Sequence, residues 1–230
     1  MLKKNLAINI NKAHYPVTVL GPGRRIGIWL QGCAIGCKGC VSQDTWDANV
    51  NRIMSVDQLL AWCKQVVSRD KLGFDGVTIS GGEPFDQPEA LSALLDALNK
   101  WRNTLKNPPA SNFDVLCYSG YPLTILQKKY PTILAKLDAL IPEPYIDTKP
   151  TKQLWRGSEN QSLQLLTNRA QIKYATVVEQ TPAQANKHIQ VMLDGQKVWY
   201  IGIPQRGDMQ ALEARCQEQG IEFTQASWHT

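Results

Sequence analysis

Hydrophobic and polar residues alternate along the chain in blocks that predict strands and helices in turn. The run 25–30, Arg-Ile-Gly-Ile-Trp-Leu, is short, apolar and bounded by glycines, which is typical of a buried strand. Residues 55–67 repeat apolar side chains at helical spacing behind a serine, which predicts a capped helix. The stretch 76–80 predicts a second strand, and a helix with leucines on one side follows from about Pro88.

The same alternation continues through the middle of the chain. Residues 103–112 contain a Pro-Pro pair and predict a loop, and 113–118 predict a strand. Helical spacing over 123–137 is interrupted at Pro131, and a short strand is expected over 137–141. Strands that alternate with helices predict an α/β fold with a parallel sheet, whose sites lie at the carboxyl ends of the strands.

The last third of the chain does not continue the alternation of strands and helices. Residues 148–167 are polar and irregular, and 168–185 are interpreted as a polar connection. Two apolar segments, 188–193 and 197–203, flank Asp194-Gly195 and predict a β-hairpin.

A helix is predicted over 208–219, where it ends at Gly220. The hairpin and this helix together are expected to form a small appendage. We therefore expect a main domain over 1–167 and a C-terminal extension over 168–230.

Composition and charge narrow the class of protein. The chain has 230 residues, 43% of them hydrophobic, and Lys+Arg 25 against Asp+Glu 20 gives a net charge of +5, which fits a globular protein and gives no indication of nucleic-acid binding. Arg24 and Arg25 are expected to be solvated charges, or alternatively to act electrostatically on an anionic group. No window has the 18 or so consecutive apolar residues of a membrane span, so we expect no membrane partner and a cytoplasmic protein.

The cysteines are unevenly spread. The chain has six: Cys63, Cys117 and Cys216 stand alone, and three lie within eight residues, Cys33, Cys37 and Cys40. A tight triplet with isolated cysteines elsewhere indicates a reduced metal site rather than a disulfide framework. Structural zinc takes four protein ligands, and iron–sulfur clusters normally take four cysteines. In an iron–sulfur cluster, a cysteine triplet therefore leaves one iron open to a substrate or cofactor. The alternative from another class of protein is a non-catalytic metal-binding module that holds zinc or a passive electron-transfer cluster.

A second motif, Gly81-Gly82-Glu83-Pro84, ends the strand expected over 76–80. Its glycines allow backbone groups to approach a ligand closely, and Glu83 can accept hydrogen bonds from an ammonium group. An ordinary strand-to-helix turn is the simpler interpretation of the same residues.

Together these two motifs resemble the radical S-adenosylmethionine (SAM) superfamily, in which three cysteines hold a [4Fe-4S] cluster. Gly21-Pro22-Gly23, Gln31-Gly32-Cys33 and Asp44-Thr45-Trp46-Asp47 resemble the glycyl-radical-enzyme activases, which include the pyruvate formate-lyase and anaerobic ribonucleotide reductase activators. Gly39 and the segments 118–121 and 155–161 are more similar to the reductase activators. Those commonly carry Asp-Gly-Pro where this chain has Pro142-Glu143-Pro144.

The resemblance implies a partial (β/α)6 barrel over the main domain. It implies reductive cleavage of SAM to a 5′-deoxyadenosyl radical, which abstracts hydrogen from a glycine of a partner enzyme. Carried over by position, the iron ligands are Cys33, Cys37 and Cys40, and the methionine-binding edge is Gly81, Gly82 and Glu83. Gly39 and Val41 are expected near the adenine and the cluster, and Ser119 and Gly120 near the ribose or carboxylate.

The resemblance also implies partners. A glycyl radical enzyme, or another protein or peptide, is the expected substrate, and flavodoxin or ferredoxin is the expected electron donor. The alternative within the superfamily is an enzyme acting on a small molecule or peptide, similar to 7-carboxy-7-deazaguanine synthase.

Overall fold

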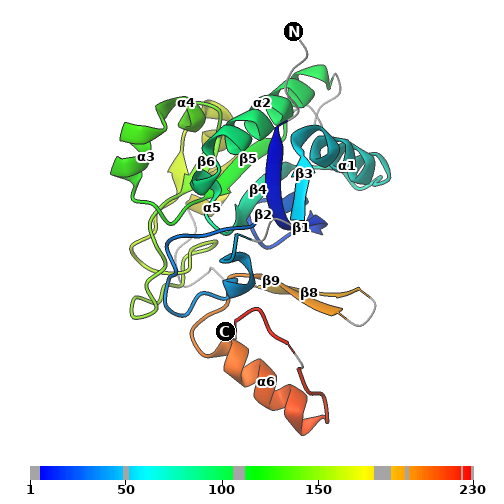
Figure 1. Ribbon diagram of the computed structural model, residues 1–230, viewed down its shortest axis with the longest axis vertical. Coiled ribbons are helices and arrows are strands. Elements are labelled where there is room, and N and C mark those ends of the chain that lie inside the picture. The colour runs from blue at the N-terminus through cyan, green and yellow to red at the C-terminus, as the bar shows by residue number, and fades with distance from the viewer. Residues whose placement is uncertain are drawn as a thin grey trace.

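The computed structural model describes residues 6–48, 52–105, 112–178, 188–194, 197–223 and 225–228. These residues form an α/β fold with one seven-stranded sheet and a separate hairpin of two strands (Figure 1). The strands of the large sheet lie in the order β3-β1-β2-β4-β5-β6-β7. Their bounds are Ala7–Val17 (β1), Arg25–Leu30 (β2), Ile53–Ser55 (β3), Gly76–Gly81 (β4), Asp114–Tyr118 (β5), Ala139–Ile141 (β6) and Gln164–Leu165 (β7).

The centre of the sheet is parallel. Strands β2, β4, β5 and β6 pair in parallel, which confirms the four strands expected between residues 25 and 141. At the edges β1, β3 and β7 pair antiparallel. The sheet is open, so the finer description as a six-stranded partial barrel is not confirmed by the described residues.

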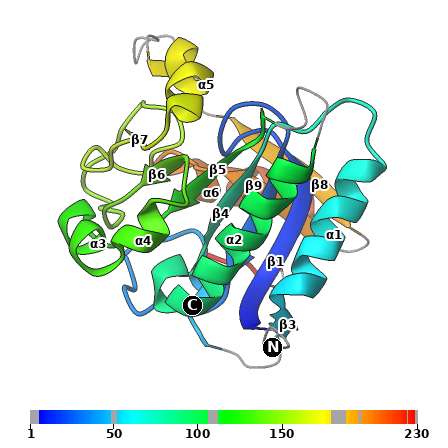
Figure 2. The ribbon, with the colours of Figure 1, turned by 90° about the horizontal axis from the view of Figure 1, so that it is seen from above.

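One face of the sheet carries the larger part of the core. Alternate side chains of the parallel strands point to this face, among them Ile26, Ile28, Val77 and Ile79. Helices α1 (Val56–Ser68) and α2 (Pro88–Thr104) lie side by side over them (Figure 2). The serine cap predicted for α1 is confirmed, since Ser55 and Gln58 form a capping box.

The opposite face is covered by two smaller clusters. Near β5 and β6, Leu116 and Ile141 pack with Trp155 and with Ala170 and Tyr174 of α5 (Asn168–Val178). Near β1 and β2, Trp29 packs with Ile201 of the hairpin. The two faces of each strand therefore serve different layers, because successive side chains alternate in direction.

The remaining helices and strands begin and end close to the boundaries expected from the sequence. The break at Pro131 separates α3 (Leu123–Lys129) from α4 (Pro131–Leu134). The hairpin is confirmed as β8 (Ile189–Asp194) and β9 (Lys197–Gly202), although its turn at Gly195 lies outside the described residues. The last helix is confirmed as α6 (Asp208–Glu218).

Two elements differ from the sequence expectations. The 11-residue strand β1 was not anticipated, because only Ile8, Ile10 and Val17 are buried along it and polar residues occupy much of the rest. Residues 168–178, interpreted as polar connection, form α5 instead. Its buried Ala170 and Tyr174 are four positions apart, which is a helical signal too short to stand out from a polar background.

No helix among the described residues is long and apolar enough to cross a membrane. The division of the chain at residue 167 stays a prediction.

Candidate functional site

A cavity of about 280 Å³ lies at the carboxyl edge of the parallel strands. The loop after β2, the end of β4 and the end of β5 contribute to its wall. It brings together all ten residues singled out from the sequence: Cys33, Cys37, Gly39, Cys40, Val41, Gly81, Gly82, Glu83, Ser119 and Gly120. This convergence follows from the topology, since the carboxyl ends of parallel strands meet at one edge of a sheet. The roles of these residues stay predictions.

The cysteine loop is closed at its base by backbone hydrogen bonds. Gly32 N donates to Thr45 O at 2.7 Å, and Cys33 N donates to Trp46 O at 3.0 Å. Buried Thr45 belongs to the short 3-10 helix η1 (Gln43–Thr45), where its hydroxyl donates to Ser42 O at 2.6 Å. The loop therefore starts and ends at one fixed point, with its cysteines between.

The three thiols are half-buried and free. Ser42 N–H points to Cys40 Sγ at 3.4 Å, a contact of the kind that tunes iron–sulfur clusters. Burial raises the pKa of the Cys37 and Cys40 thiols, so both are neutral until a metal displaces their protons. Among the described residues no three Cys, His, Asp or Glu side chains converge on a single ion. Three free thiols on one cavity wall are the donor set that an iron–sulfur cluster takes, with one iron left open.

The double glycine is required by the close approach of two backbone segments. A Cβ on Gly81 would lie 2.4 Å from Leu30 N, and one on Gly82 would lie 2.1 Å from Gly32 O. Gly82 N and Glu83 N donate to Leu30 O and Gly32 O, both at 2.8 Å. The end of β4 is thus fixed against the start of the cysteine loop, which places the two motifs next to each other.

Glu83 joins the ends of two strands. Its side chain is 1% exposed and accepts from Phe85 N (2.9 Å), Ser119 Oγ (2.9 Å) and Gly120 N (2.7 Å). These donors are all neutral. Burial raises the pKa of the Glu83 carboxyl to about 7, and the three hydrogen bonds oppose the rise. Ser119 and Gly120 therefore hold the carboxylate in this structure, and all three line the cavity.

Gly39 and Val41 flank Cys40 on the exposed side of the loop. Gly39 has φ +78°, and a Cβ there would lie 3.3 Å from Asp147 Oδ1. The carbonyl of Val41 accepts from the Ser227 hydroxyl at 2.8 Å. The loop that carries the predicted ligands is therefore in contact with the end of the chain.

Several cavity residues were not singled out as site residues, although Tyr118 belongs to the segment 118–121 noted in the sequence. Tyr118 and Tyr145 line the wall near the strand ends. A second group comes from the C-terminal third, where Ile203, Pro204, Met209 and Trp228 line the cavity. Only the fold brings that group near the cysteine loop, because more than 150 residues separate them in the chain.

Glu143 occupies a strained position beside the cavity. It is a non-glycine residue with φ +84°, in the region that costs a side chain about 1–2 kcal/mol. The related Asp-Gly-Pro pattern would place glycine here without strain. Glu143 Oε1 accepts from Leu123 N at 3.1 Å, and this contact at the start of α3 offsets part of the cost.

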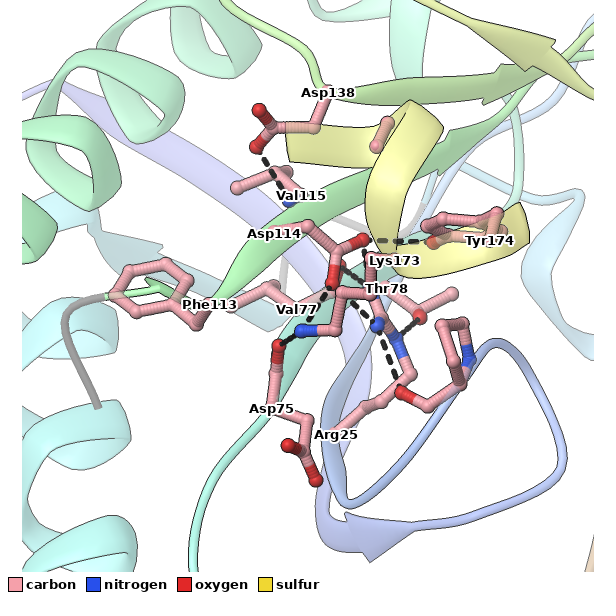
Figure 3. Close-up of polar contacts among 12 residues, drawn as sticks. Arg25, Asp75, Val77, Thr78, Phe113, Asp114, Val115, Asp138, Lys173 and Tyr174 are labelled. Carbon is pink, nitrogen blue, oxygen red and sulfur yellow. Dashed lines mark hydrogen bonds and ion pairs between the residues drawn. The ribbon is translucent and has the colours of Figure 1, made fainter. Parts of the chain in front are cut away.

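Arg25 is not a solvated charge, and it does not approach the cysteine loop. It begins β2 at the opposite, amino edge of the sheet and is 0% exposed. Its guanidinium donates twice to Asp114, at 2.8 and 2.9 Å, and once to Thr78 at 2.7 Å (Figure 3). Tyr174 OH and Lys173 Nζ also meet the Asp114 carboxylate, at 2.7 and 3.0 Å. This ion cluster is structural, because every charge in it has a partner within the fold.

Comparison with known proteins identifies the family. The sequence profile described as "4Fe-4S single cluster domain" matches residues 19–164. The anaerobic ribonucleoside-triphosphate reductase-activating protein of Vibrio cholerae is 29% identical over 159 residues, which are 67% of this chain and 96% of that protein. The protein of the same name from Enterobacteria phage T4 is 31% identical over 148 residues, which are 63% of this chain and 86% of that protein.

Among solved structures, QueE from Escherichia coli is similar, with 26% identity and a TM-score of 0.38 over 50% of this chain and 52% of that chain. The family profile ends before α5, so the hairpin and α6 lie beyond it. The match covers the whole cysteine loop and the Gly81–Glu83 motif. The chain therefore belongs to the 4Fe-4S single-cluster family and is a radical SAM enzyme of the glycyl-radical-activating type, with a [4Fe-4S] cluster and SAM as its cofactors.

Proposed function

We propose that this chain activates an anaerobic ribonucleotide reductase by abstracting a hydrogen atom from a glycine of that enzyme. The relatives whose names state this activity match this chain over most of their own length. The observation that carries the proposal is the cavity that joins the cysteine loop to the Gly81–Glu83 edge.

Cys33, Cys37 and Cys40 are the residues that would hold the cluster. When bound, the cluster supplies the electron that cleaves SAM to methionine and a 5′-deoxyadenosyl radical. The residues of the chain position SAM and exclude water from the cavity. With both cofactors bound, the chemistry supplied would be transfer of a hydrogen atom from the partner's glycine Cα to the 5′-deoxyadenosyl group, which would give 5′-deoxyadenosine and a glycyl radical.

The strand-end motif offers binding groups for the methionine part of SAM. The Glu83 carboxylate lies on the cavity wall with neutral donors on its protein side, so an ammonium group in the cavity would supply its missing counter-charge. The same ammonium would lower the raised pKa of Glu83. We assign Gly81 and Gly82 to the backbone edge beside it, Gly39 and Val41 to the adenine side, and Ser119 and Gly120 to the support of Glu83.

The proposal extends to the electron donor, the location and the domain organisation. We assign electron transfer to flavodoxin or ferredoxin, because the chain holds a single cysteine triplet for its own cluster. A cytoplasmic location is supported by the free state of all six cysteines. The open parallel sheet is the counterpart of the partial barrel of this superfamily, and residues 168–230 are assigned to the extension.

The test is anaerobic reconstitution with iron and sulfide, followed by electron paramagnetic resonance of the reduced protein with and without SAM. A SAM-dependent change in the cluster signal, with release of 5′-deoxyadenosine, is expected. Addition of the anaerobic ribonucleotide reductase encoded in the same genome should then produce a glycyl radical signal on that enzyme. The reductase with its radical glycine replaced by alanine is the matched control.

A small molecule or peptide is the second candidate substrate. It is favoured by the C-terminal residues that line the cavity, because they lie beyond the family match and add a wall that the family profile does not include. SAM cleavage without any glycyl radical on the reductase would favour this candidate. A cluster that is indifferent to SAM would contradict both.

A further inference from the structure

The C-terminal cap, as we call the described residues from 202 to 228, forms part of the cavity wall although it lies outside the family match. It follows the hairpin, whose inner face is docked on the sheet. Ile201 packs with Trp29, and the Gln190 side chain donates to Pro16 O at 2.8 Å and accepts from Thr18 N at 3.0 Å. The cap therefore starts from an anchored position.

After β9 the chain continues along the wall of the cavity. Ile203, Pro204 and Met209 line the cavity, and Met209 is 6% exposed. The guanidinium of Arg206, in the same segment, lies 3.7 Å from the Asp147 carboxylate. Asp147 in turn is adjacent to Gly39 of the cysteine loop.

Beyond α6 the chain returns to the cavity. The rings of Tyr200, Phe223 and Trp228 meet edge-on in a trio with centroids 6.1 to 6.3 Å apart. The Trp228 indole N–H donates to the Glu213 carboxylate of α6, and the same side chain lines the cavity. Figure 1 shows this red end of the chain beside the blue segment that follows β2.

The tail is bonded to the segment that follows Cys40. Gln43 N donates to Ser227 O at 2.8 Å, Ser227 Oγ donates to Val41 O at 2.8 Å, and Gln43 Nε2 donates to Trp228 O at 3.3 Å. The residue between Val41 and Gln43 is Ser42, whose N–H points to Cys40 Sγ. The tail therefore holds Val41 and Gln43, the two neighbours of Ser42, whose N–H contacts the predicted cluster ligand Cys40.

We propose that the C-terminal cap is a built-in wall of the cofactor cavity, in which Ser227 is a positioning residue that holds the Cys40 side of the cluster loop and limits access of oxygen to the cluster. The proposal deepens the function proposed above, since it takes the cluster as the occupant of the cavity. With the cap in place, the volume of about 280 Å³ is at the lower end of ligand-pocket volumes, so bound cofactors leave little space for solvent.

The test uses the full-length protein and two variants of the tail. One variant is truncated after Phe223, which removes Ser227 and Trp228. The other is Ser227→Ala, which removes one hydrogen bond. Ser68→Ala is the matched control, because the Ser68 hydroxyl also donates to a backbone carbonyl, Gln65 O at 2.9 Å, on α1 and outside the cavity wall.

The first readout is the rate at which oxygen bleaches the visible absorbance of the reconstituted cluster. If oxygen enters when the cap opens, the rate follows the open population, so loss of the Ser227 hydrogen bond should raise it about fivefold. Truncation should raise it by about tenfold or more, since three hydrogen bonds and Trp228 are lost together. The Ser68→Ala control should bleach at the wild-type rate. The thermal stability of Ser227→Ala should equal that of the wild type.

The second readout needs no iron. In the reduced apo protein, the rate at which iodoacetamide alkylates Cys40, followed by mass spectrometry, should rise in both tail variants relative to Cys33. Equal alkylation and bleaching in Ser227→Ala and Ser68→Ala would overturn the proposal even if the truncated protein fails to fold. Because alkylation of Cys40 depends on neither SAM nor a reductase, a failure of the proposed function is distinguishable from a failure of the cap.

Discussion

The two edges of the parallel sheet both bury a carboxylate, but they neutralise it differently. At the amino edge, Asp114 meets Arg25, Lys173 and Tyr174, and these partners keep its pKa at about 2 despite complete burial. At the carboxyl edge, the hydrogen-bond donors that Glu83 meets among the described residues are neutral N–H and O–H groups, and burial raises its pKa to about 7. The same α/β fold therefore contains two kinds of edge. We call the amino edge complete, because the Asp114 charge is neutralised by charged partners, and the carboxyl edge incomplete, because the Glu83 carboxylate has no counter-charge among the described residues.

The difference distinguishes a structural site from the binding site that we propose. A charge that the fold neutralises by itself needs nothing further, whereas a buried carboxylate without a counter-charge on a cavity wall is the kind of group that a cationic ligand would neutralise. Sequence inspection does not make this distinction, because Arg25 and Glu83 both stand beside glycine-rich turns.

The largest expected effect is on the incomplete edge. Cys37→Ala should abolish assembly of the [4Fe-4S] cluster, and with it the SAM-dependent signal in electron paramagnetic resonance, because the remaining two thiolates leave two irons without a protein ligand. Cys216→Ala on α6 is the matched control and should retain full iron content. Retained iron in Cys37→Ala, measured together with sulfide, would contradict the ligand assignment.

At the complete edge, loss of a charged group should lower the stability of the protein instead of its cofactor binding. Asp114→Ala leaves the fully buried Arg25 without its counter-charge, which should lower the free energy of unfolding of the apo protein by about 3–5 kcal/mol. Asp96→Ala is the control, since Asp96 pairs with Lys136 at the surface and should cost less than about 1 kcal/mol. Urea denaturation measures both, and equal losses would remove the distinction between the two kinds of pair.

Glu83 should give the apo protein a characteristic pH dependence. Its folded pKa of about 7 lies above the ordinary 4.5, so between these values the folded protein holds a proton that the unfolded chain releases. The corresponding stability is present below about pH 4.5 and lost as pH rises through about 7, on the order of 3 kcal/mol. In Glu83→Gln this slope should be absent; a wild-type slope in the variant would assign the titration to another group.

The smallest expected effect concerns the contact between the two motifs. Gly82→Ala places a Cβ against the Gly32 carbonyl and should cost about 1–3 kcal/mol while weakening SAM binding. Gly220→Ala has open space and φ +73°, so it should cost about 1 kcal/mol with SAM affinity unchanged. Calorimetric titration of the reconstituted proteins compares the two, and equal SAM affinities would show that the Gly82 contact does not shape the site.

The strongest sequence predictions came from residues whose neighbours along the chain decide their structure. Helix α1 has its serine cap and apolar face within 13 residues, and the buried strands β2 and β4 are bounded by glycines. Strand β1 and helix α5 were missed because their apolar positions become meaningful only against distant partners, such as Trp155 beside Tyr174. For the same reason the sequence left open whether Arg25 is solvated or acts on an anionic group, since its partner Asp114 lies 89 residues away.

The sequence by itself determined the chemistry of this protein, because the cysteine spacing and the Gly81–Glu83 motif are local and both fall at predicted strand ends. Tertiary structure alone decided which charges are neutralised, that Glu83 is held by Ser119 and Gly120, and that Trp228 lines the cavity while Ser227 bonds to Val41. The physical reason is that burial, counter-charge and cavity walls depend on residues that meet only after the chain has folded.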